Sequence, residues 1–148
     1  MLDITIKLFE ELTTNELYAL LQLRSEVFVV EQDCVYQDID GKDNRALHVL
    51  GFKNYELVAY TRIFTSGDYF ENASIGRVIV KSTERSHKYG YDIMNASIQA
   101  ISDQFNETII KISAQKHLEY FYNNLGFVAV SEPYLEDGIP HISMLLKP

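Results

Sequence analysis

The amino-terminal third of the chain shows two hydrophobic patterns. Residues 2–8 alternate apolar and polar side chains, which is the period of a half-buried strand. Thr13 and Glu16 then have the spacing of a capping box, and apolar residues recur at helical spacing over residues 14–30. We therefore predict a strand followed by a helix. The polar, Asp-rich stretch 32–45 is predicted to form a loop with one helical turn.

The remainder of the chain alternates short β-rich segments with two further helical segments. The helical segments cover residues 90–105 and 117–124. The strand segments cover residues 48–52, 57–64, 74–80, 109–113, 127–130 and 141–146. The order β-α-β-β-β-α-β-α-β-β predicts an α/β (α+β) fold, with a mixed central sheet of about seven strands and helices on both faces. Neither a repeat nor a linker interrupts residues 1–148, so a single domain is predicted.

Composition and charge limit what this domain does. The 148 residues are 47% hydrophobic and 23% charged, which is typical of a globular chain. The formal net charge of −8 repels phosphate backbones and anionic lipids, so we expect neither nucleic acid nor a membrane as partner. Cys34 is the single cysteine, so no internal disulfide and no cysteine-based metal site is expected. The start lacks a signal-peptide pattern, and we expect a cytoplasmic protein.

One segment carries the opposite charge to the rest of the chain. Residues 77–88 contain four basic side chains and one acid, so this window has a charge of +3 while the remainder has −11. The window also joins a predicted strand to the start of a predicted helix, where free N–H groups and the helix dipole favour an anion. A phosphate site is one interpretation, and a solvated loop with unrelated basic residues is the other.

Two motifs resemble a known family. Ile75-Gly-Arg-Val-Ile-Val80, followed by Arg85-Ser-His-Lys-Tyr-Gly90, is similar to the acetyl-CoA-binding core of the Gcn5-related N-acetyltransferases (GNAT), whose loop signature is Arg/Gln-x-x-Gly-x-Gly/Ala. Phe121-Tyr-Asn-Asn-Leu-Gly-Phe127 resembles their second signature, a short helix that presents a tyrosine before a Gly-Phe turn. The segments that resemble the ElaA-like branch of this superfamily are residues 17–24, 27–32, 36–41 and 136–141.

The resemblance implies the GNAT fold and a set of residues that hold acetyl-CoA as co-substrate. Main-chain groups of β-rich residues 78–80 would bind the pantetheine arm, and amides of residues 86–90 would cap the pyrophosphate. Lys88 stands where the family usually has its first glycine, and Gln115 where many relatives carry Asn. The implied cofactor-binding residues are Val78, Ile79, Val80, Arg85, Ser86, His87, Lys88, Tyr89, Gly90 and Gln115.

Transfer of an acyl group from a thioester to an amine needs a proton donor for the thiolate and a proton acceptor for the amine. By the same resemblance, Tyr122 would protonate the departing thiolate. The candidates for the base, chosen by residue type, are Glu31, His48 and His141, followed by Glu26 and Asp40. Each also has a purely structural interpretation at the end of a predicted element. Arg77, within a central strand, is expected to bind an internal acid or an anionic substrate group.

The sequence thus predicts an acetyl-CoA-dependent N-acetyltransferase that acetylates a primary amine of a small molecule or peptide by direct attack. Residues 26–40 and the final hairpin, residues 134–141, are predicted to wall the acceptor pocket. One alternative is a non-catalytic acyl-CoA-binding regulatory module. Another is an acyltransferase similar to acyl-homoserine lactone synthases, which have a motif similar to Arg24-x-x-Val-Phe28. A homodimer is one option for assembly.

Overall fold

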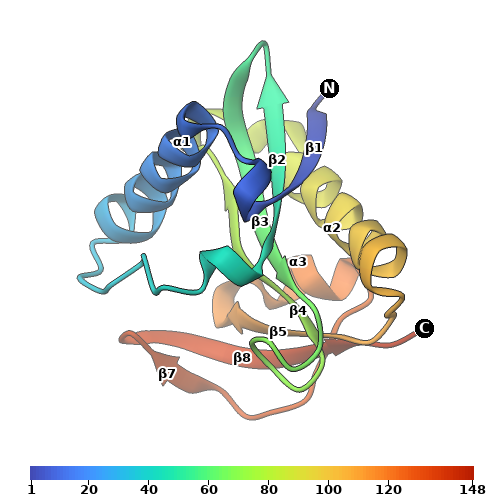
Figure 1. Ribbon diagram of the computed structural model, residues 1–148. Coiled ribbons are helices and arrows are strands. Elements are labelled where there is room, and N and C mark those ends of the chain that lie inside the picture. The colour runs from blue at the N-terminus through green and yellow to red at the C-terminus, as the bar shows by residue number, and fades with distance from the viewer.

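One eight-stranded sheet forms the centre of the protein, which a computed structural model describes over all residues 1–148 (Figure 1). The strands are β1 (Asp3–Leu8), β2 (Leu47–Lys53), β3 (Glu56–Phe64), β4 (Ala73–Val80), β5 (Ile110–Gln115), β6 (Val128–Ala129), β7 (Tyr134–Glu136) and β8 (Ile139–Leu146). Their spatial order is β1-β2-β3-β4-β5-β8-β6, and β7 pairs with the first residues of β8. Only β4 and β5 run parallel, so the sheet is mixed, as predicted.

The sheet has one strand more than the seven predicted. The additional strand is β7, which is only three residues long, too short for an alternating pattern to be recognised. It forms a hairpin with β8 through Asp137 and Gly138, whose φ angles of 52° and 77° suit a two-residue turn. The final hairpin is therefore longer than the sequence pattern indicated, and its turn reaches the candidate site.

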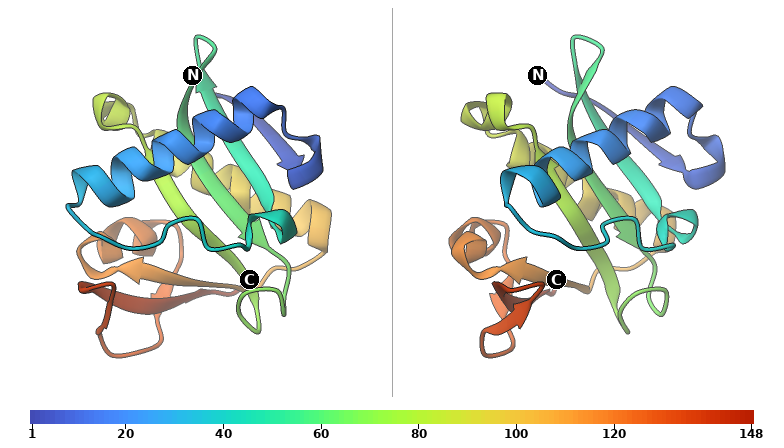
Figure 2. Two further views of the ribbon diagram at one scale, coloured as in Figure 1. Left: turned by 60° about the vertical axis from the view of Figure 1, so that its left-hand side comes forward. Right: turned by 90° about the vertical axis from the view of Figure 1, so that its left-hand side faces the viewer.

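Helices cover both faces of the sheet, as predicted (Figures 1 and 2). α1 (Thr14–Arg24) packs on one face, where Leu20 and Leu23 join Tyr60 and other sheet residues in one apolar cluster. α2 (Tyr89–Phe105) and α3 (Glu119–Asn124) pack on the other face and contribute to a second, larger cluster. The short 3₁₀ segments are η1 (Phe9–Glu11), η3 (Asp43–Arg45), η4 (Ser82–His87) and η5 (Lys116–Leu118).

The first helix begins as predicted but changes its winding before it ends. Glu16 N donates to Thr13 Oγ1 at 3.1 Å, and Thr13 N donates to Glu16 Oε1 at 2.8 Å, which completes the capping box. The α-helical part stops at Arg24 and continues as a π-helix, η2 (Ser25–Glu31). The helix predicted over residues 14–30 is therefore present, but its last turns have π winding, which hydrophobic spacing does not distinguish from α winding. Such π segments are frequent at functional sites.

β4 and β5 pair over only two residues and then separate. Ala73 pairs with Ile110, and Ser74 pairs with Lys111. The register between β3 and β4 shifts near Arg77, whose φ of 50° marks a bulge in β4. A bulge bends the strand that carries it. The central sheet therefore opens between the carboxyl-terminal parts of β4 and β5.

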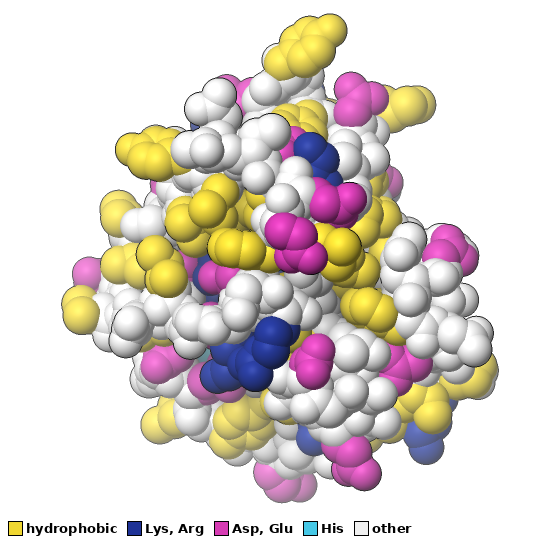
Figure 3. All heavy atoms as spheres, in the orientation of Figure 1, with side chains coloured by type: hydrophobic (Ala, Val, Ile, Leu, Met, Phe, Trp, Pro, Cys, Tyr) yellow, Lys and Arg dark blue, Asp and Glu magenta, His cyan; other side chains and the backbone are white.

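Charged side chains of both signs share the surface. On the face drawn in Figure 3, a small group of Lys and Arg side chains lies near the centre, single ones are scattered above and below it, and Asp and Glu side chains lie among them. Together with a formal net charge of −8, this leaves that face without a continuous basic surface. None of the helices has both the length and the apolar composition that a membrane span requires.

Candidate active site

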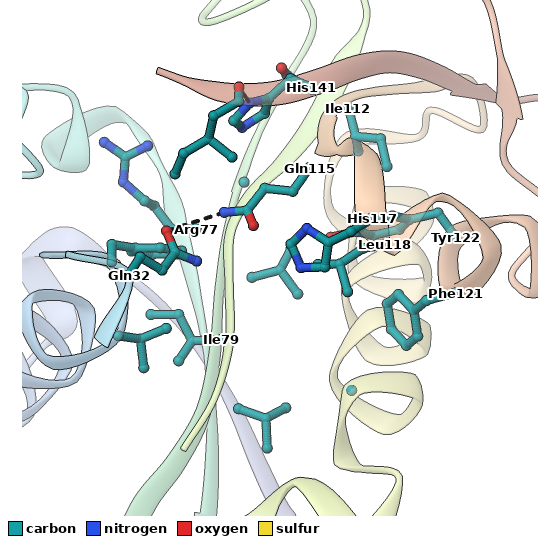
Figure 4. A pocket seen from close by; sticks show the side chains of 18 of the residues that line it. Gln32, Arg77, Ile79, Ile112, Gln115, His117, Leu118, Phe121, Tyr122 and His141 are labelled. Atoms are coloured by element: carbon teal, nitrogen blue, oxygen red, sulfur yellow. Dashed lines mark hydrogen bonds between the residues drawn. The ribbon is translucent and has the colours of Figure 1, made fainter. Parts of the chain in front are cut away.

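A pocket of about 520 Å³ lies where β4 and β5 separate (Figure 4). Its lining comes from η2 and the loop after it, β4, the start of α2, β5, α3 and the β7–β8 hairpin. Half of the lining residues are hydrophobic, and the polar ones come from segments that are far apart in the sequence. A largely apolar cavity on which a few polar groups converge is the usual form of a small-molecule site.

The basic loop between β4 and α2 forms one end of the pocket. Arg85, Lys88 and Gly90 line it. Lys88 adopts the left-handed conformation, with φ 61° and ψ 26°, immediately before the first residue of α2. A Cβ at Gly90 would lie 3.2 Å from the ring of Phe121, so glycine allows the helix start to approach α3 closely. The loop thus directs positive charge and a helix amino terminus at the same space.

Arg85 crosses this end of the pocket. Its Nη1 and Nη2 donate to Glu31 Oε2 and Oε1 at 2.5 and 3.0 Å, which makes a bidentate ion pair with the end of η2. Its Nε donates to the carbonyl oxygen of Val80 at 2.9 Å, at the end of β4. All three residues line the pocket. Glu31, a candidate base from its residue type, therefore serves as the counter-ion of Arg85.

Tyr122 projects from α3 into the pocket (Figure 4). The residue is only 5% exposed, and its ring packs edge-on against Phe121 and Phe127. Burial raises the pKa of its phenol, and neither a charge nor a hydrogen bond opposes that shift. The hydroxyl therefore stays protonated at neutral pH and is available as a donor to whatever occupies the pocket.

An amide bridge spans the middle of the pocket. Gln115, the last residue of β5, donates from Nε2 to Oε1 of Gln32 at 3.3 Å, shown by the dashed line in Figure 4. Gln32 directly follows η2. In Figure 4, Gln115 lies between His141 on one side and His117 on the other. The bridge therefore ties the end of the π-helix to the strand on the far side of the gap.

His141, on β8, lines the pocket and has a different partner at each ring nitrogen. Its Nδ1 lies 2.7 Å from the carbonyl oxygen of Ile139. Since a carbonyl only accepts, Nδ1 carries a proton, and Nε2 is the nitrogen that has the lone pair when the ring is neutral. Nε2 lies 3.4 Å from Glu136 Oε2, and the ring stacks on Tyr134. The side chain is 9% exposed, so the protein fixes both the orientation and the tautomer of a proton acceptor.

The loop after η2 closes the same side of the pocket. Cys34 Sγ donates to the carbonyl oxygen of Asp137 at 3.4 Å and so joins this loop to the β7–β8 turn. Tyr36, also in the loop and in the pocket lining, donates from its hydroxyl to Asp38 Oδ1 at 2.9 Å. The loop and the hairpin together wall the space in front of His141, in agreement with the walls predicted from the sequence.

Buried ion pairs hold that loop on the sheet. Arg24 of α1 donates to Asp38 Oδ2 at 2.9 Å and to Asp43 Oδ1 at 2.7 Å. Arg62 of β3 donates to both oxygens of Asp40, at 2.9 and 2.6 Å, and to Asp43 Oδ1 at 2.9 Å. Arg24 is fully buried and Arg62 is 1% exposed, so each guanidinium depends on these carboxylates.

Arg77 completes this arginine–aspartate network, which consists of Arg24, Arg62, Arg77, Asp38, Asp40 and Asp43. Arg77 Nε donates to Asp38 Oδ1 at 2.7 Å, and its guanidinium lies 5.7 Å from the ring centre of Tyr36. The expectation that Arg77 binds an internal acid is therefore confirmed. Three arginines face three aspartates, so the network has no net charge, and it positions Tyr36 in the pocket lining.

Comparison with known proteins decides the family. Residues 10–148 match the family described as Acetyltransferase (GNAT) domain. The chain belongs to the GNAT family. It is 51% identical to Protein ElaA of Escherichia coli (strain K12) over 138 residues, which cover 90% of this chain and 89% of that protein. This GNAT chain also shares the fold of two solved structures at a TM-score of 0.92 each.

The first of these solved structures is an acyl-CoA N-acyltransferase from Pseudomonas aeruginosa, which is 44% identical with 99% of both chains covered. The second is Escherichia coli ElaA, which is 46% identical with 99% of this chain and 100% of that chain covered. The resemblance seen in the sequence motifs, and the mixed GNAT fold that it implied, are therefore confirmed.

The pocket of this GNAT protein brings together most of the site residues that the sequence suggested. Those in its lining are Glu31, Val78, Ile79, Val80, Arg85, Lys88, Gly90, Gln115, Tyr122 and His141. The side chains of Ser86, His87 and Tyr89 lie outside the lining, and Tyr89 packs in the core instead. Their predicted contribution concerns backbone amides and stays a prediction.

Three further candidates for the base do not face the pocket. His48 is fully buried between Tyr60, whose hydroxyl lies 2.6 Å from Nδ1, and the carbonyl oxygen of Asp43, so the hypothesis that it is the base is wrong. Asp40 is bound by Arg62. Glu26 is exposed and outside the lining.

Sequence reasoning missed the polar pocket residues Tyr91, Ser113 and His117, and it included Gln32 and Tyr36 only as part of the predicted wall, residues 26–40. Gln32 and His117 stand one and two residues after sites that the sequence did suggest, Glu31 and Gln115. Their positions next to suggested site residues could therefore have indicated that they also line the pocket. Cys34, which had no predicted role, joins the loop after η2 to the β7–β8 turn through the carbonyl oxygen of Asp137.

Lys88→Gly is expected to raise the stability of the fold by about 0.5–1 kcal/mol. The left-handed conformation of Lys88 costs about 1–2 kcal/mol, which glycine avoids. Glycine is also more flexible in the unfolded chain, and this flexibility offsets part of the gain. The same change removes a cation from the pocket and should weaken acetyl-CoA binding by up to about fivefold. Thermal unfolding and calorimetric titration measure the two effects.

Asn106→Gly is the control for Lys88→Gly, because Asn106 has a similar φ of 55° but lies outside the pocket lining. It should leave acetyl-CoA affinity unchanged. Tighter binding by Lys88→Gly would show that the lysine side chain obstructs the cofactor rather than contacting it.

Proposed function

We propose that this GNAT protein is an acetyl-CoA-dependent N-acetyltransferase that acetylates a primary amine of a small molecule or peptide by direct attack. One observation carries the proposal: a buried phenol without a partner and an imidazole whose Nε2 contacts only the Glu136 carboxylate line the same pocket. Amide formation from a thioester needs a group that takes a proton from the amine and a group that donates one to the thiolate. Tyr122 and His141 supply both.

The basic end of the pocket suits acyl-CoA. Lys88 and the amino terminus of α2 would face the pyrophosphate, and main-chain groups of Val78 and Val80 would hold the pantetheine arm as an added strand. The similarity to the acyl-CoA N-acyltransferase from Pseudomonas aeruginosa supports this assignment. Acetyl-CoA would supply the thioester carbonyl carbon that the amine attacks.

Tyr122 would assist departure of the thiolate. A thiol has a pKa of about 8.5, well below that of a buried phenol, so the phenol stabilises developing negative charge chiefly by donating a hydrogen bond. Since a thiolate is already a good leaving group, this assistance belongs at the low end of general-acid effects, about 10²-fold or less.

His141 would take the proton from the amine. Its Nδ1–H is held by the Ile139 carbonyl, so Nε2 is the acceptor, and the carboxylate of Glu136 at 3.4 Å stabilises the imidazolium that forms. Proton removal leaves the amine nitrogen with the lone pair that it needs for attack. The arrangement uses the pocket's own groups and needs no covalent enzyme intermediate.

A direct assay tests the proposal. The purified protein is titrated with acetyl-CoA, and release of free CoA thiol is then followed with a panel of primary amines. Turnover with at least one amine supports the proposal, whereas tight binding without turnover would support an acyl-CoA-binding regulatory module instead.

We also propose a cytoplasmic setting, which the free thiol of Cys34 supports because free thiols persist in reducing compartments.

Tyr122→Phe is expected to lower kcat by about 10- to 100-fold while acetyl-CoA affinity stays close to that of the parent. The variant removes only the hydroxyl, so the packing of the ring against Phe121 and Phe127 is kept. Tyr120→Phe is the matched control, because Tyr120 lies on the same helix but points to solvent. An unchanged kcat, with chemistry shown to be rate-limiting, would falsify the acid role.

A further inference from the structure

Glu31 and Arg85 form the one bidentate ion pair among the residues that line the basic end of the pocket. The pair joins η2 to the loop after β4, two segments more than 50 residues apart in the sequence. Every nitrogen of the guanidinium is engaged, because Nε donates to Val80 O while Nη1 and Nη2 donate to the carboxylate. Three of the five N–H donors of Arg85 are therefore used, and neither two-pronged face of the guanidinium is wholly free.

These contacts use the same groups that acyl-CoA would use under the proposed function. A phosphate and a carboxylate both accept two parallel N–H bonds from one guanidinium, so Glu31 and a CoA phosphate compete for Arg85. The carbonyl oxygen of Val80 likewise accepts either from Arg85 or from an amide of the pantetheine arm. One side chain therefore covers two of the groups on which cofactor binding depends.

We infer that Glu31 is a positioning residue that opposes acyl-CoA binding by holding Arg85, and that it does not deprotonate the acceptor amine. The inference rests on the proposed function, because it concerns the site that would bind acyl-CoA. Both carboxylate oxygens of Glu31 already accept from Arg85, so neither is oriented to take a proton from an amine. His141, which lines the same pocket, holds Nδ1 on the Ile139 carbonyl and leaves Nε2 as the nitrogen that can accept a proton.

The size of the effect depends on exposure. The side chains of Arg85 and Glu31 are 43% and 37% exposed, so solvent screens the pair, and exposed ion pairs change equilibria by about 1.4- to 5-fold. Neutralising Glu31 also removes a negative charge from the end of the pocket where phosphate is expected. Both contributions have the same sign, since each favours the anionic cofactor.

Glu31→Gln is therefore expected to bind CoA about two- to fivefold more tightly than the parent, with a slower dissociation rate, as measured by calorimetry and stopped-flow displacement. Glu26→Gln is the matched control, because Glu26 lies in the same π-helical segment but is exposed and outside the pocket lining. It should bind CoA as the parent does. Both variants should have the thermal stability of the parent.

A double-mutant cycle with Arg85→Gln separates competition from a general charge effect. If Glu31 acts by holding Arg85, the gain from Glu31→Gln should largely disappear in the Arg85→Gln background. Unchanged or weaker CoA binding by Glu31→Gln would overturn the inference, as would a loss of amine turnover at unchanged CoA affinity. No CoA binding by the parent would overturn the proposed function, and this inference with it, so the two failures are distinguishable.

Discussion

Asp43→Asn is expected to lower the free energy of unfolding by about 3–5 kcal/mol, the largest effect on stability that we expect from a single substitution. Asp43 Oδ1 accepts from Arg24 at 2.7 Å and from Arg62 at 2.9 Å, and both arginines are buried. Asparagine has nearly the same shape but no charge, so the variant leaves the three guanidinium groups of the network facing two carboxylates, with one positive charge uncompensated. Urea unfolding measures the change.

The control for Asp43→Asn is Asp103→Asn, on the exposed face of α2, which should change stability by no more than about 0.5 kcal/mol. The pH dependence provides a second readout. Burial alone would raise the pKa of Asp43, but the hydrogen bonds and charges of Arg24 and Arg62 outweigh burial and hold this pKa below its usual range. Stability from such a depressed group is present at neutral pH and is lost as the pH falls below about 4.

The parent should therefore lose stability in acid more steeply than Asp43→Asn, because the variant has already lost the titrating carboxylate. Equal acid sensitivity of the two proteins, or a loss of stability below about 1 kcal/mol at neutral pH, would show that the buried arginines find other partners when Asp43 is neutral.

His141→Asn is expected to lower kcat/KM for the amine by about 10²- to 10⁴-fold, the range for loss of a general base. Asparagine keeps an N–H where Nδ1 donates to Ile139, so the hairpin contact is retained, while the acceptor at Nε2 is removed. Acetyl-CoA affinity should be unchanged. The acidic limb of the pH profile of kcat/KM, which reports deprotonation of the base, should also disappear.

His117→Asn is the matched control for His141→Asn, because His117 lines the same pocket but is exposed. It should leave the pH profile intact. If His141→Asn matches the parent between about pH 6 and about pH 9 with an amine that is a proven substrate, His141 is not the base. If His117→Asn has the large effect instead, the base lies on the other side of Gln115.

The layers of the fold could be predicted because they depend on short-range patterns. Alternation over residues 2–8 identified β1, and Thr13 with Glu16 marked the start of α1. β7 was missed because a three-residue strand is defined by its partner rather than by its own pattern. The π-helical winding of η2 was missed because the apolar positions continue through it without a break.

The candidate site could be predicted in part, for a different physical reason. The basic window and Tyr122 lie in continuous motifs, so the resemblance to the GNAT family was enough to predict that both belong to one site, and both line the pocket. The partner of Arg85 lies 54 residues away in the sequence, and that of Arg77 lies 39 residues away. Such pairings depend on how the sheet brings segments together, so Glu31 was interpreted by its residue type alone.

Two contacts in the pocket depend on the number of residues in the π-helical segment η2. Glu31 and Gln32 stand at its end, where one binds Arg85 and the other binds Gln115. Deletion of a single residue within this segment would shift the residues after it along the helix axis and rotate them about it. Substitutions here alter the ion pair or the amide bridge separately, whereas a change in length alters both at once. We therefore expect this segment to tolerate substitutions better than insertions or deletions.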